Sequence, residues 1–300
     1  MFVSVIIPAY NAEKTIYNCI RSCIKQKEYL KEIIIIDDFS TDNTWAEVSK
    51  FNDANPDLIK LFQNLTKGGN NARNFGFKQA SGQFIQWLDA DDELGDNKLK
   101  YQVEFLIREN RFQIAYCNWE IKTVYENGKF NEESKVEQQC NDFLTKLIKD
   151  KWLPPHAYLL RYESALKIYD NKGWNPESSV LQDREYFTIA ALLGFQFGYV
   201  ENTQVTYYRY KFIHSVSKAD NYSRSLALYN ILMRIKSSEF LENNKLKNLE
   251  IYVDSLILIS QLQINLKTQK YVSPTKIKWK LFPGKRLRFK AILKLYLPFY

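Results

Sequence analysis

The sequence predicts an α/β fold, in which helices cover a mostly parallel central sheet, followed by a helical, basic C-terminal region. Two observations support the sheet: short apolar runs alternate with helical patterns over the first third of the chain, and clusters of carboxylates follow those runs. A third supports the C-terminal region, because bases without acids gather at that end. A chain of 300 residues is long enough to bury a substantial core.

The first predicted strand–helix unit lies at the start of the chain. Residues 3–7 form an apolar run that ends at Pro8. Apolar residues then recur at helical spacing, at Ile16, Cys19, Ile20, Cys23 and Ile24. This pattern indicates a strand followed by an amphipathic helix.

The second unit begins with four consecutive isoleucines, residues 33–36, as expected of a strand covered on both faces. This run ends in Asp37 and Asp38. Ser40 or Thr41 can cap a following helix, and residues 58–62 form a third strand pattern. The predicted order is therefore βαβαβ.

Residues 83–88 form an aromatic-rich strand pattern that runs directly into Asp89, Asp91 and Asp92. Clustered carboxylates suit a hard divalent cation such as Mg²⁺ or Mn²⁺. A solvated turn near a helix N-terminus explains the same acids equally well. In open α/β sheets, ligands bind outside the carboxyl ends of the strands, so we expect Pro8, Asp38 and residues 89–92 to converge on one crevice.

Four segments in register resemble family 2 glycosyltransferases with the GT-A fold. They are Val3-Ser4-Val5-Ile6-Ile7-Pro8-Ala9-Tyr10-Asn11, Ile36-Asp37-Asp38-Phe39-Ser40-Thr41-Asp42, Ala72-Arg73-Asn74-Phe75-Gly76 and Leu88-Asp89-Ala90-Asp91-Asp92. The resemblance covers about the first 215 residues and implies a Rossmann-like GT-A domain. Phe39 departs from the family, which usually has Gly there, so we expect a tighter or differently twisted turn.

The resemblance implies roles for the residues of these segments. Asp38 would contact the base or ribose of a nucleotide, beside a wall of Pro8, Ala9 and Tyr10, and Arg73 would lie near the nucleotide. Asp91 would bind Mn²⁺ or Mg²⁺ directly, with Asp89 acting on the metal or ribose, directly or through water. From the residues alone, Tyr10 as a core aromatic, Arg73 in a surface salt bridge and Asp92 as a helix cap remain open.

The resemblance also implies a catalytic base. Asp183 precedes an apolar helical stretch, where the family usually has Glu-Asp, and Gln182 replaces the usual Glu. As base, Asp183 would take the proton of the acceptor hydroxyl in a direct displacement that inverts configuration. Without the family match, Asp183 would be read as a helix-cap acid.

Other candidates lie between and beyond these motifs. His214 could complete the coordination of the metal, or it could be a loop histidine without a ligand. The polar interval 126–139 suggests a mobile loop. An acceptor-binding wall could be formed by Trp152, Tyr158, Trp174 and Glu177, although core packing is the commoner fate of such aromatic residues. His156 lies where acceptor-facing residues are often found, and is a further candidate.

The excess of basic residues comes from the C-terminal end. Ten of the 42 bases follow Asp254, with no acid after it, so 32 bases and 34 acids precede that region. Because residues 276–300 interleave the bases with aromatic and aliphatic side chains, we expect them to attach to an anionic membrane surface. Nucleic-acid binding and a merely solvated tail are the alternatives. Helical patterns at 222–235 and 246–266 precede this tail.

These expectations place the protein in the cytoplasm, peripherally on the inner face of the cytoplasmic membrane. No apolar run reaches the roughly 20 residues that span a bilayer, and the chain begins with a strand pattern instead of a signal peptide. The four cysteines suggest reduced thiols and no disulfide framework. We expect a domain at 1–218, with a nucleotide-sugar part at about 1–118 and an acceptor part at about 119–218, and a C-terminal region at 219–300.

The predicted function is metal-dependent, inverting transfer of a sugar from a nucleotide-sugar, most simply a UDP-sugar, to a lipooligosaccharide, capsule or other surface-polysaccharide acceptor. The alternative is a catalytically inactive nucleotide-sugar-binding or membrane-associated scaffold protein, suggested by Phe39, Gln182 and the displaced His214. A dinucleotide-binding oxidoreductase is disfavoured, because no Gly-x-Gly-x-x-Gly turn follows the first strand. The sequence indicates no nucleic-acid partner and leaves the oligomeric state undetermined.

Overall fold

The computed structural model describes residues 2–149, 151–211 and 220–238, together with residues 253–254, 256–257, 260 and 264. The chain divides into two compact units. The first contains Met1–Glu177 and Ile189–Ile213, and the second contains Ser178–Thr188 and His214–Tyr300. The beginning of α7 therefore groups with the C-terminal part of the chain.

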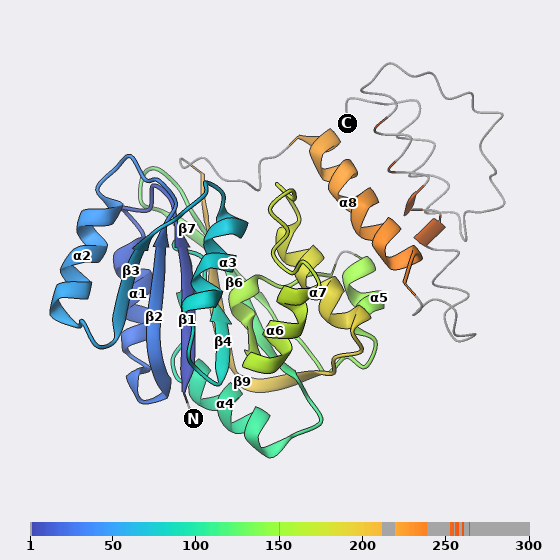
Figure 1. Cartoon of the computed structure of the whole chain (residues 1–300), viewed down its shortest axis with the longest axis horizontal. Helices are drawn as coiled ribbons and strands as arrows, with labels where there is room; N and C mark the ends of the chain where they lie inside the picture. The colour runs from blue at the N-terminus through green and yellow to red at the C-terminus, as the bar shows by residue number, and fades with distance from the viewer. Residues whose placement is uncertain are drawn as a thin grey trace. The chain divides into compact units, whose positions relative to one another are not determined.

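Four parallel strands form the first half of the sheet, in the order β3-β2-β1-β4 (Figure 1). These strands are β1 (Val3–Ala9), β2 (Leu30–Asp37), β3 (Ile59–Gln63) and β4 (Phe84–Trp87). Helices α1 (Ile16–Ile24), α2 (Thr44–Ala54) and α3 (Gly69–Gln79) connect them. The predicted parallel sheet with flanking helices is confirmed for this half.

The second half of the sheet is mixed. Strand β8 (Tyr158–Arg161) is antiparallel to both β4 and β6 (Ile114–Val124), and β9 (Phe197–Tyr210) is parallel to β6. The edge strand β5 (Glu93–Leu94) is antiparallel to β9. The expectation of a mostly parallel sheet is therefore wrong for this half, where β6 and β9 form the parallel pair and the other pairs are antiparallel.

The expected mobile loop at 126–139 is wrong for part of its length. Strand β7 (Phe130–Lys135) pairs antiparallel with the end of β6, across a turn in which Gly128 has φ +76°. Five of the six β7 side chains are exposed. The polar composition therefore reflects an exposed edge strand, and not an irregular segment.

The remaining elements surround this sheet or follow it. They are η1 (Lys27–Tyr29), α4 (Lys98–Arg108), α5 (Phe143–Ile148), η2 (Pro155–Ala157), α6 (Tyr162–Asp170), α7 (Gln182–Leu192) and α8 (Asn221–Lys236). Helix α8 confirms the predicted helix at 222–235. The tail at 276–300 and most of 246–266 lie outside the described residues. Within the described part of the chain, no helix is both long and apolar enough to cross a membrane.

The core of the first unit lies on both faces of β1 and β2. Ile33, Ile34, Ile35 and Ile36 are fully buried, as expected of a strand covered on both sides. Helix α3 approaches this sheet closely at Gly76, where an added Cβ would lie 2.6 Å from Cγ2 of Ile6. The glycine is therefore what allows α3 to pack this closely against the strands.

The four cysteines are unpaired, and three of them are buried. Cys19 and Cys23 lie on the inner face of α1, and Cys117 lies in β6. Cys140 is half-buried. The absence of disulfides agrees with the expectation of reduced thiols.

Candidate functional site

The loops that follow β1 and β2 are joined by hydrogen bonds at the carboxyl edge of the sheet. The backbone N–H of Asn11 donates to Oγ of Ser40 at 3.0 Å, and the side chain of Asn11 accepts from the N–H of Thr41 at 2.8 Å. The N–H of Asp38 donates to the carbonyl of Ala9 at 2.7 Å. Because β2, β1 and β4 are adjacent and parallel, the segments after all three lie at one edge.

Asp38 is buried at this edge and joins β2 to the loop before α3. Its carboxylate accepts from Nδ2 of Asn64 at 2.7 Å and from the N–H of Gly68 at 2.8 and 3.0 Å. Gly68 precedes the first residue of α3 and has φ +128°, a conformation that suits glycine. Asp38 therefore fixes the entry into α3.

Phe39 adopts a left-handed conformation with φ +61° and exposes its ring. This conformation is costly for a residue with a Cβ. The sequence predicts an altered turn here because Phe39 stands where the family usually has Gly. The backbone nevertheless keeps a conformation that Gly adopts readily, and Phe39 carries its cost.

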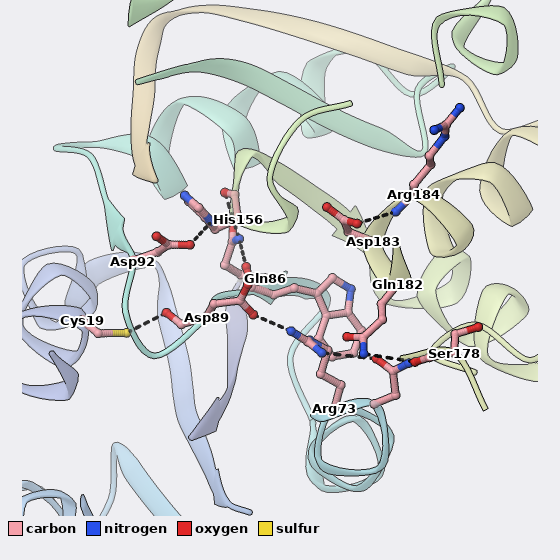
Figure 2. A network of polar contacts seen from close by, with 12 residues as sticks. Cys19, Arg73, Gln86, Asp89, Asp92, His156, Ser178, Gln182, Asp183 and Arg184 are labelled. Carbon is pink, nitrogen blue, oxygen red and sulfur yellow. Dashed lines mark hydrogen bonds and ion pairs between the residues drawn. The ribbon is translucent and has the colours of Figure 1, made fainter. Parts of the chain in front are cut away.

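Arg73 in α3 forms an ion pair with the acid that follows β4. Its Nη2 lies 2.6 Å from Oδ1 of Asp89, and its Nη1 donates to Oδ1 of Asn70 at 3.3 Å (Figure 2). Arg73 is only 9% exposed. A salt bridge was the structural alternative for Arg73, and it exists here as a largely buried pair within the motif.

The ring of Trp174 lies over the guanidinium of Arg73, with 4.5 Å between Cζ and the ring centroid. The ring also contacts Trp87 in β4, with 5.4 Å between the centroids in an edge-to-face arrangement. The carbonyl of Trp174 accepts from Nδ2 of Asn74 in α3 at 2.7 Å. Trp174 is 2% exposed, so its ring packs in the core and offers no open face to a sugar.

Asp91 is the exposed member of the acidic cluster. Burial by surrounding protein atoms and then the negative charge of Asp89 raise the pKa of Asp91 to about 6. The side chain of Asp91 reaches solvent, and its carboxylate lies near the negative charge of Asp89. A bound cation would offset this negative charge. Since Asp89 is engaged by Arg73, Asp91 is the carboxylate that fits a divalent metal best.

Asp92 points into the protein instead of toward solvent. Its Oδ1 accepts from the N–H of Tyr208 in β9 at 2.7 Å, and its Oδ2 lies 3.2 Å from Nδ1 of His156. Burial, followed by Asp91 and Asp89, raises the pKa of Asp92, and burial lowers the pKa of His156 to about 3. Both shifts favour uncharged forms, so Asp92 joins the acidic loop to β9 and η2 without a buried net charge.

Gln86, which lies next to His156 in Figure 2, belongs to a further buried polar network. Gln86 donates from Nε2 to the carbonyl of His156 at 3.1 Å and accepts at Oε1 from Nζ of Lys98, which also donates to the carbonyl of Tyr158 at 3.1 Å. Gln102 donates to the carbonyl of Ala157 at 3.0 Å. The backbone of η2 and the start of β8 is therefore held by side chains from β4 and α4.

The remaining sequence candidates differ in exposure. Ala9 is buried and Pro8 half-buried, whereas the ring of Tyr10 is 49% exposed, with Nζ of Lys67 at 4.8 Å from its centroid. Tyr10 is therefore a surface residue and not a core aromatic. His156 is fully buried, so it does not face an acceptor. Trp152 is half-buried beside Trp119, with 5.5 Å between ring centroids, and Glu177 is exposed.

The model of the family described as Glycosyl transferase family 2 matches residues 4–159, which include the four motifs except for Val3. The chain belongs to glycosyl transferase family 2. Two Escherichia coli members, WfgD and WfaP, are both described as UDP-Glc:alpha-D-GlcNAc-diphosphoundecaprenol beta-1,3-glucosyltransferase. WfgD is 43% identical over 138 residues, covering 45% of this chain and 52% of its own length.

WfaP is 36% identical over 155 residues, covering 50% of this chain and 61% of its own length. The matches therefore span about half of this chain and little more than half of these relatives. Among solved structures, residues 1–349 of Staphylococcus aureus TarS in complex with UDP-GlcNAc superpose with a TM-score of 0.63 at 23% identity. This likeness covers 97% of this chain and 79% of that chain, and it confirms the GT-A type of fold.

The candidate base of the family, Asp183, belongs to the second compact unit. It lies in the first turn of α7, where its Oδ1 accepts from the N–H of Arg184 at 2.8 Å. Gln182, in place of the usual Glu, donates to the carbonyls of Ser178 and Ser179 at 3.1 and 3.3 Å. Asp183 is half-buried, and its position fits both a helix-terminus acid and a base.

The predicted metal site consists of His214 and the carboxylates Asp89 and Asp91. His214 lies outside the described residues. Within the described ranges, no three side chains of His, Cys, Asp or Glu are grouped so that they could hold a metal ion. Asp91, with water and the oxygens of a diphosphate, would be a sufficient set for Mg²⁺ or Mn²⁺, which often use only one or two protein carboxylates.

Sequence reasoning missed Lys98 and the partners of Asp92. Lys98 and Gln102 are four residues apart and occupy the same face of α4 as the buried Leu99 and Leu106. A lysine at that spacing was a readable signal of a buried polar network. The contact of Asp92 with Tyr208 joins residues 116 positions apart, and no local pattern indicates it.

Proposed function

We propose that this protein transfers a sugar from a UDP-sugar to a lipid-linked or polymeric glycan acceptor during assembly of a surface polysaccharide such as lipooligosaccharide or capsule. Family membership supports glycosyl transfer. The names of WfgD and WfaP, both UDP-glucose-dependent and both acting on a diphospholipid-linked sugar, support the donor and the kind of acceptor. The fold shared with TarS bound to UDP-GlcNAc is consistent with a nucleotide site at the carboxyl edge of the sheet.

The observation that carries the proposal is the Arg73–Asp89 ion pair beside the exposed Asp91, at the ends of β4, β1 and β2. A nucleoside diphosphate sugar presents a base, a ribose and two phosphates. In our proposal Asp38 and the wall of Pro8, Ala9 and Tyr10 bind the nucleoside. Arg73 is a permanently charged fork that Trp174 and Asp89 hold in one orientation, and it would lie near the phosphates.

Asp91, supported by Asp89, would hold Mn²⁺ or Mg²⁺, and the ion would supply positive charge to the leaving diphosphate. His214 remains a further candidate ligand, as the sequence suggested. Charge neutralisation is needed here because Asp89 and Asp91 are close in sequence and share a negative field, as the raised pKa of Asp91 reflects.

In the proposed reaction, Asp183 accepts the proton of the acceptor hydroxyl while the hydroxyl oxygen attacks the anomeric carbon of the donor. The bond from that carbon to the diphosphate oxygen breaks, and UDP leaves from the opposite face, so configuration inverts. The N–H of Arg184 donates a hydrogen bond to Oδ1 of Asp183, and this bond helps to orient the carboxylate for the proposed role.

The test begins with the donor. Thermal unfolding of the purified chain is measured with UDP-, GDP-, dTDP- and CMP-sugars, each with and without Mn²⁺, because a ligand of the native state raises the apparent midpoint. We expect a Mn²⁺-dependent increase with UDP-sugars that Asp91→Ala abolishes. UDP release is then measured with and without lipid-linked acceptor, where Asp183→Asn should retain the thermal shift and lose turnover.

The outcomes separate the two functions considered for this chain. Equal turnover by the wild type and Asp183→Asn would exclude Asp183 as the base. A UDP-sugar shift without turnover under any condition would favour the nucleotide-sugar-binding scaffold over the transferase. No shift with any nucleotide, in a preparation shown by circular dichroism to be folded, would contradict a donor site at this edge.

A further inference from the structure

A polar groove with a volume of about 570 Å³ lies between α1, the segment around β5, and β9 in the first unit. Its lining is made of amides, hydroxyls and charged groups, among them Asn18, Arg21, Asp96, Thr203 and Gln204. Among the described residues that line it, Leu94 is the only aliphatic one. None of the candidate donor residues lines this groove.

The walls of the groove are fixed to one another. Oγ of Ser22 in α1 accepts from the N–H of Leu94 in β5 at 3.1 Å, and β5 pairs with β9. At Gly95 the backbone lies so close to β9 that an added Cβ would be 2.1 Å from the carbonyl oxygen of Gln204. The groove is therefore preformed by the backbone and does not depend on the placement of long side chains.

One buried group in the lining is without a partner. Thr203 is 6% exposed, and its hydroxyl has no hydrogen-bond partner among the residues that the structure describes. Buried hydroxyls are normally hydrogen-bonded, because an unmet one costs free energy. A ligand or water with hydroxyl groups in this groove would satisfy it.

An aromatic face continues the groove toward the acidic loop. Gln204, Thr206, Tyr208 and Tyr210 are alternate residues of β9 and therefore share one face of the strand. The rings of Tyr208 and Tyr210 are stacked, with centroids 5.8 Å apart and an interplanar angle of 10°. Glu93 lies near the hydroxyl of Tyr208, and Asp91 lies near Tyr210.

We infer that this groove binds the saccharide chain of an extended acceptor, next to the acidic loop where the donor sugar would be held. Sugar hydroxyls both donate and accept, so they suit a lining of amides, hydroxyls and charges of both signs. The flat tyrosine rings suit the C–H faces of pyranoses. Lipid tails are excluded by the scarcity of apolar lining, and Glu93 and Asp96 offset the positive charge that a polyanion would need.

This inference rests on the proposed function for its biological setting, but the groove is tested separately. An array of bacterial-type oligosaccharides is probed with the fluorescently labelled full chain and with Asn18→Ala and Gln204→Ala. Both residues are exposed and neither belongs to the candidate donor site. Glu201→Ala, an exposed residue of the same strand that does not line the groove, is the matched control.

We expect the wild type and Glu201→Ala to bind the same oligosaccharides, and each groove variant to lose about tenfold in affinity, the equivalent of about one hydrogen bond. No oligosaccharide binding by the wild type, or equal binding by all variants, would overturn the inference. Competition by inorganic pyrophosphate would also overturn it, by assigning the groove to an anion.

The thermal shift with UDP-sugar and Mn²⁺ is measured on the same preparations. A wild type that shows this shift without glycan binding would leave the proposed donor function standing and remove the groove as a saccharide site. A wild type that binds glycan through the groove without a nucleotide shift would support the groove as a saccharide site and contradict the proposed donor function. The two failures are therefore distinguishable.

Discussion

Among the residues at the carboxyl edge of the sheet, Phe39 has a backbone conformation that costs free energy. It occupies a left-handed conformation while its ring remains 43% exposed. The exposed ring gains little from packing, so the backbone cost is not offset within the turn. The two residues before it also fix this part of the chain: Asp37 accepts from the N–H of Ser40, and Asp38 accepts from the N–H of Gly68.

Two single substitutions of Phe39 distinguish the backbone strain from the contribution of the aromatic ring. Phe39→Gly and Phe39→Ala both remove the aromatic side chain, but only glycine adopts this φ without strain. We expect the free energy of unfolding of Phe39→Gly to exceed that of Phe39→Ala by about 1 kcal/mol, measured by urea denaturation. Equal stability of the two variants would mean that the turn relaxes.

Lys98 is the second residue with an unusual state. Burial lowers its pKa from 10.5 to about 7, an effect that the nearby Cys117 and Cys23 partly oppose. Between these two pH values the unfolded chain holds a proton on Lys98 that the folded chain releases. Stability therefore rises with pH through this window, and it is insensitive to Lys98 below about pH 7.

The pH dependence gives a test of this state. In Lys98→Met, the rise in the free energy of unfolding above about pH 7, which one proton limits to about 1.4 kcal/mol per pH unit, should be absent. Lys100→Met replaces an exposed lysine of the same helix and should keep the wild-type dependence. Urea titrations over this range give the comparison, and identical slopes in Lys98→Met and the wild type would contradict a buried, titrating Lys98.

Among the helices and strands, α3 combines several structural roles. It packs on β1 and β2 through Gly76, holds Arg73 toward Asp89, and anchors the segment of Trp174 through Asn74. One helix thus combines close packing with the placement of a charged side chain. A displacement of α3 would therefore affect both stability and the candidate site.

Gly76→Ala tests this coupling. The new methyl would overlap Ile6 and crowd Ile36, at 2.6 and 3.2 Å, so we expect a loss of about 1–3 kcal/mol in stability. The UDP-sugar thermal shift should also decrease, since Arg73 moves with the helix. Lys78→Ala, an exposed change in α3, should alter stability by less than about 0.5 kcal/mol. Stability unchanged by Gly76→Ala would show that the helix shifts without cost.

The parts of the fold that the sequence predicts are those with a local signal. Strands β1 and β2 are buried and rich in β-branched residues, and β3 and β4 follow apolar and aromatic patterns. The acids after β2 and β4 follow directly from the chain order. Strand β7 escaped prediction because its side chains face solvent on an edge, where no apolar alternation is needed. The hydrophobic periodicity of a strand also does not indicate whether its neighbours in the sheet are parallel or antiparallel.

The candidate site shows the same limit. Asp38, Arg73, Asp89 and Asp91 lie in short motifs, so the sequence alone is enough to propose them as site residues. Trp174 and His156 were expected to face an acceptor, but each is buried by partners that are distant in sequence, Arg73 and Asp92. Exposure of an aromatic or histidine side chain depends on such long-range packing, which a motif does not contain.

At the scale of the whole molecule, charge separates the parts of the chain. The residues up to Asp254 carry 32 bases and 34 acids, whereas the ten remaining bases all lie beyond it. The residues up to Asp254 therefore carry no net positive charge that would attract them to an anionic surface. We propose that membrane attachment depends on residues 276–300, which lie outside the described residues.

Flotation with liposomes tests this proposal. The full chain should float with vesicles that contain anionic lipid, and a chain that ends near Lys270 should remain at the bottom of the gradient, because each base contributes on the order of 1 kcal/mol at such a surface. Vesicles of neutral lipid serve as the control. Equal flotation of both chains would place the attachment elsewhere.

The placement of the cysteines gives these experiments an internal reporter. Cys19, Cys23 and Cys117 are enclosed, and Cys140 alone among the four is partly accessible. A bulky alkylating reagent should therefore modify the folded chain chiefly at Cys140, and the others only after α1 or β6 opens. Mass spectrometry of labelled Gly76→Ala or Lys98→Met would then reveal which element loosens, before any loss of activity is interpreted.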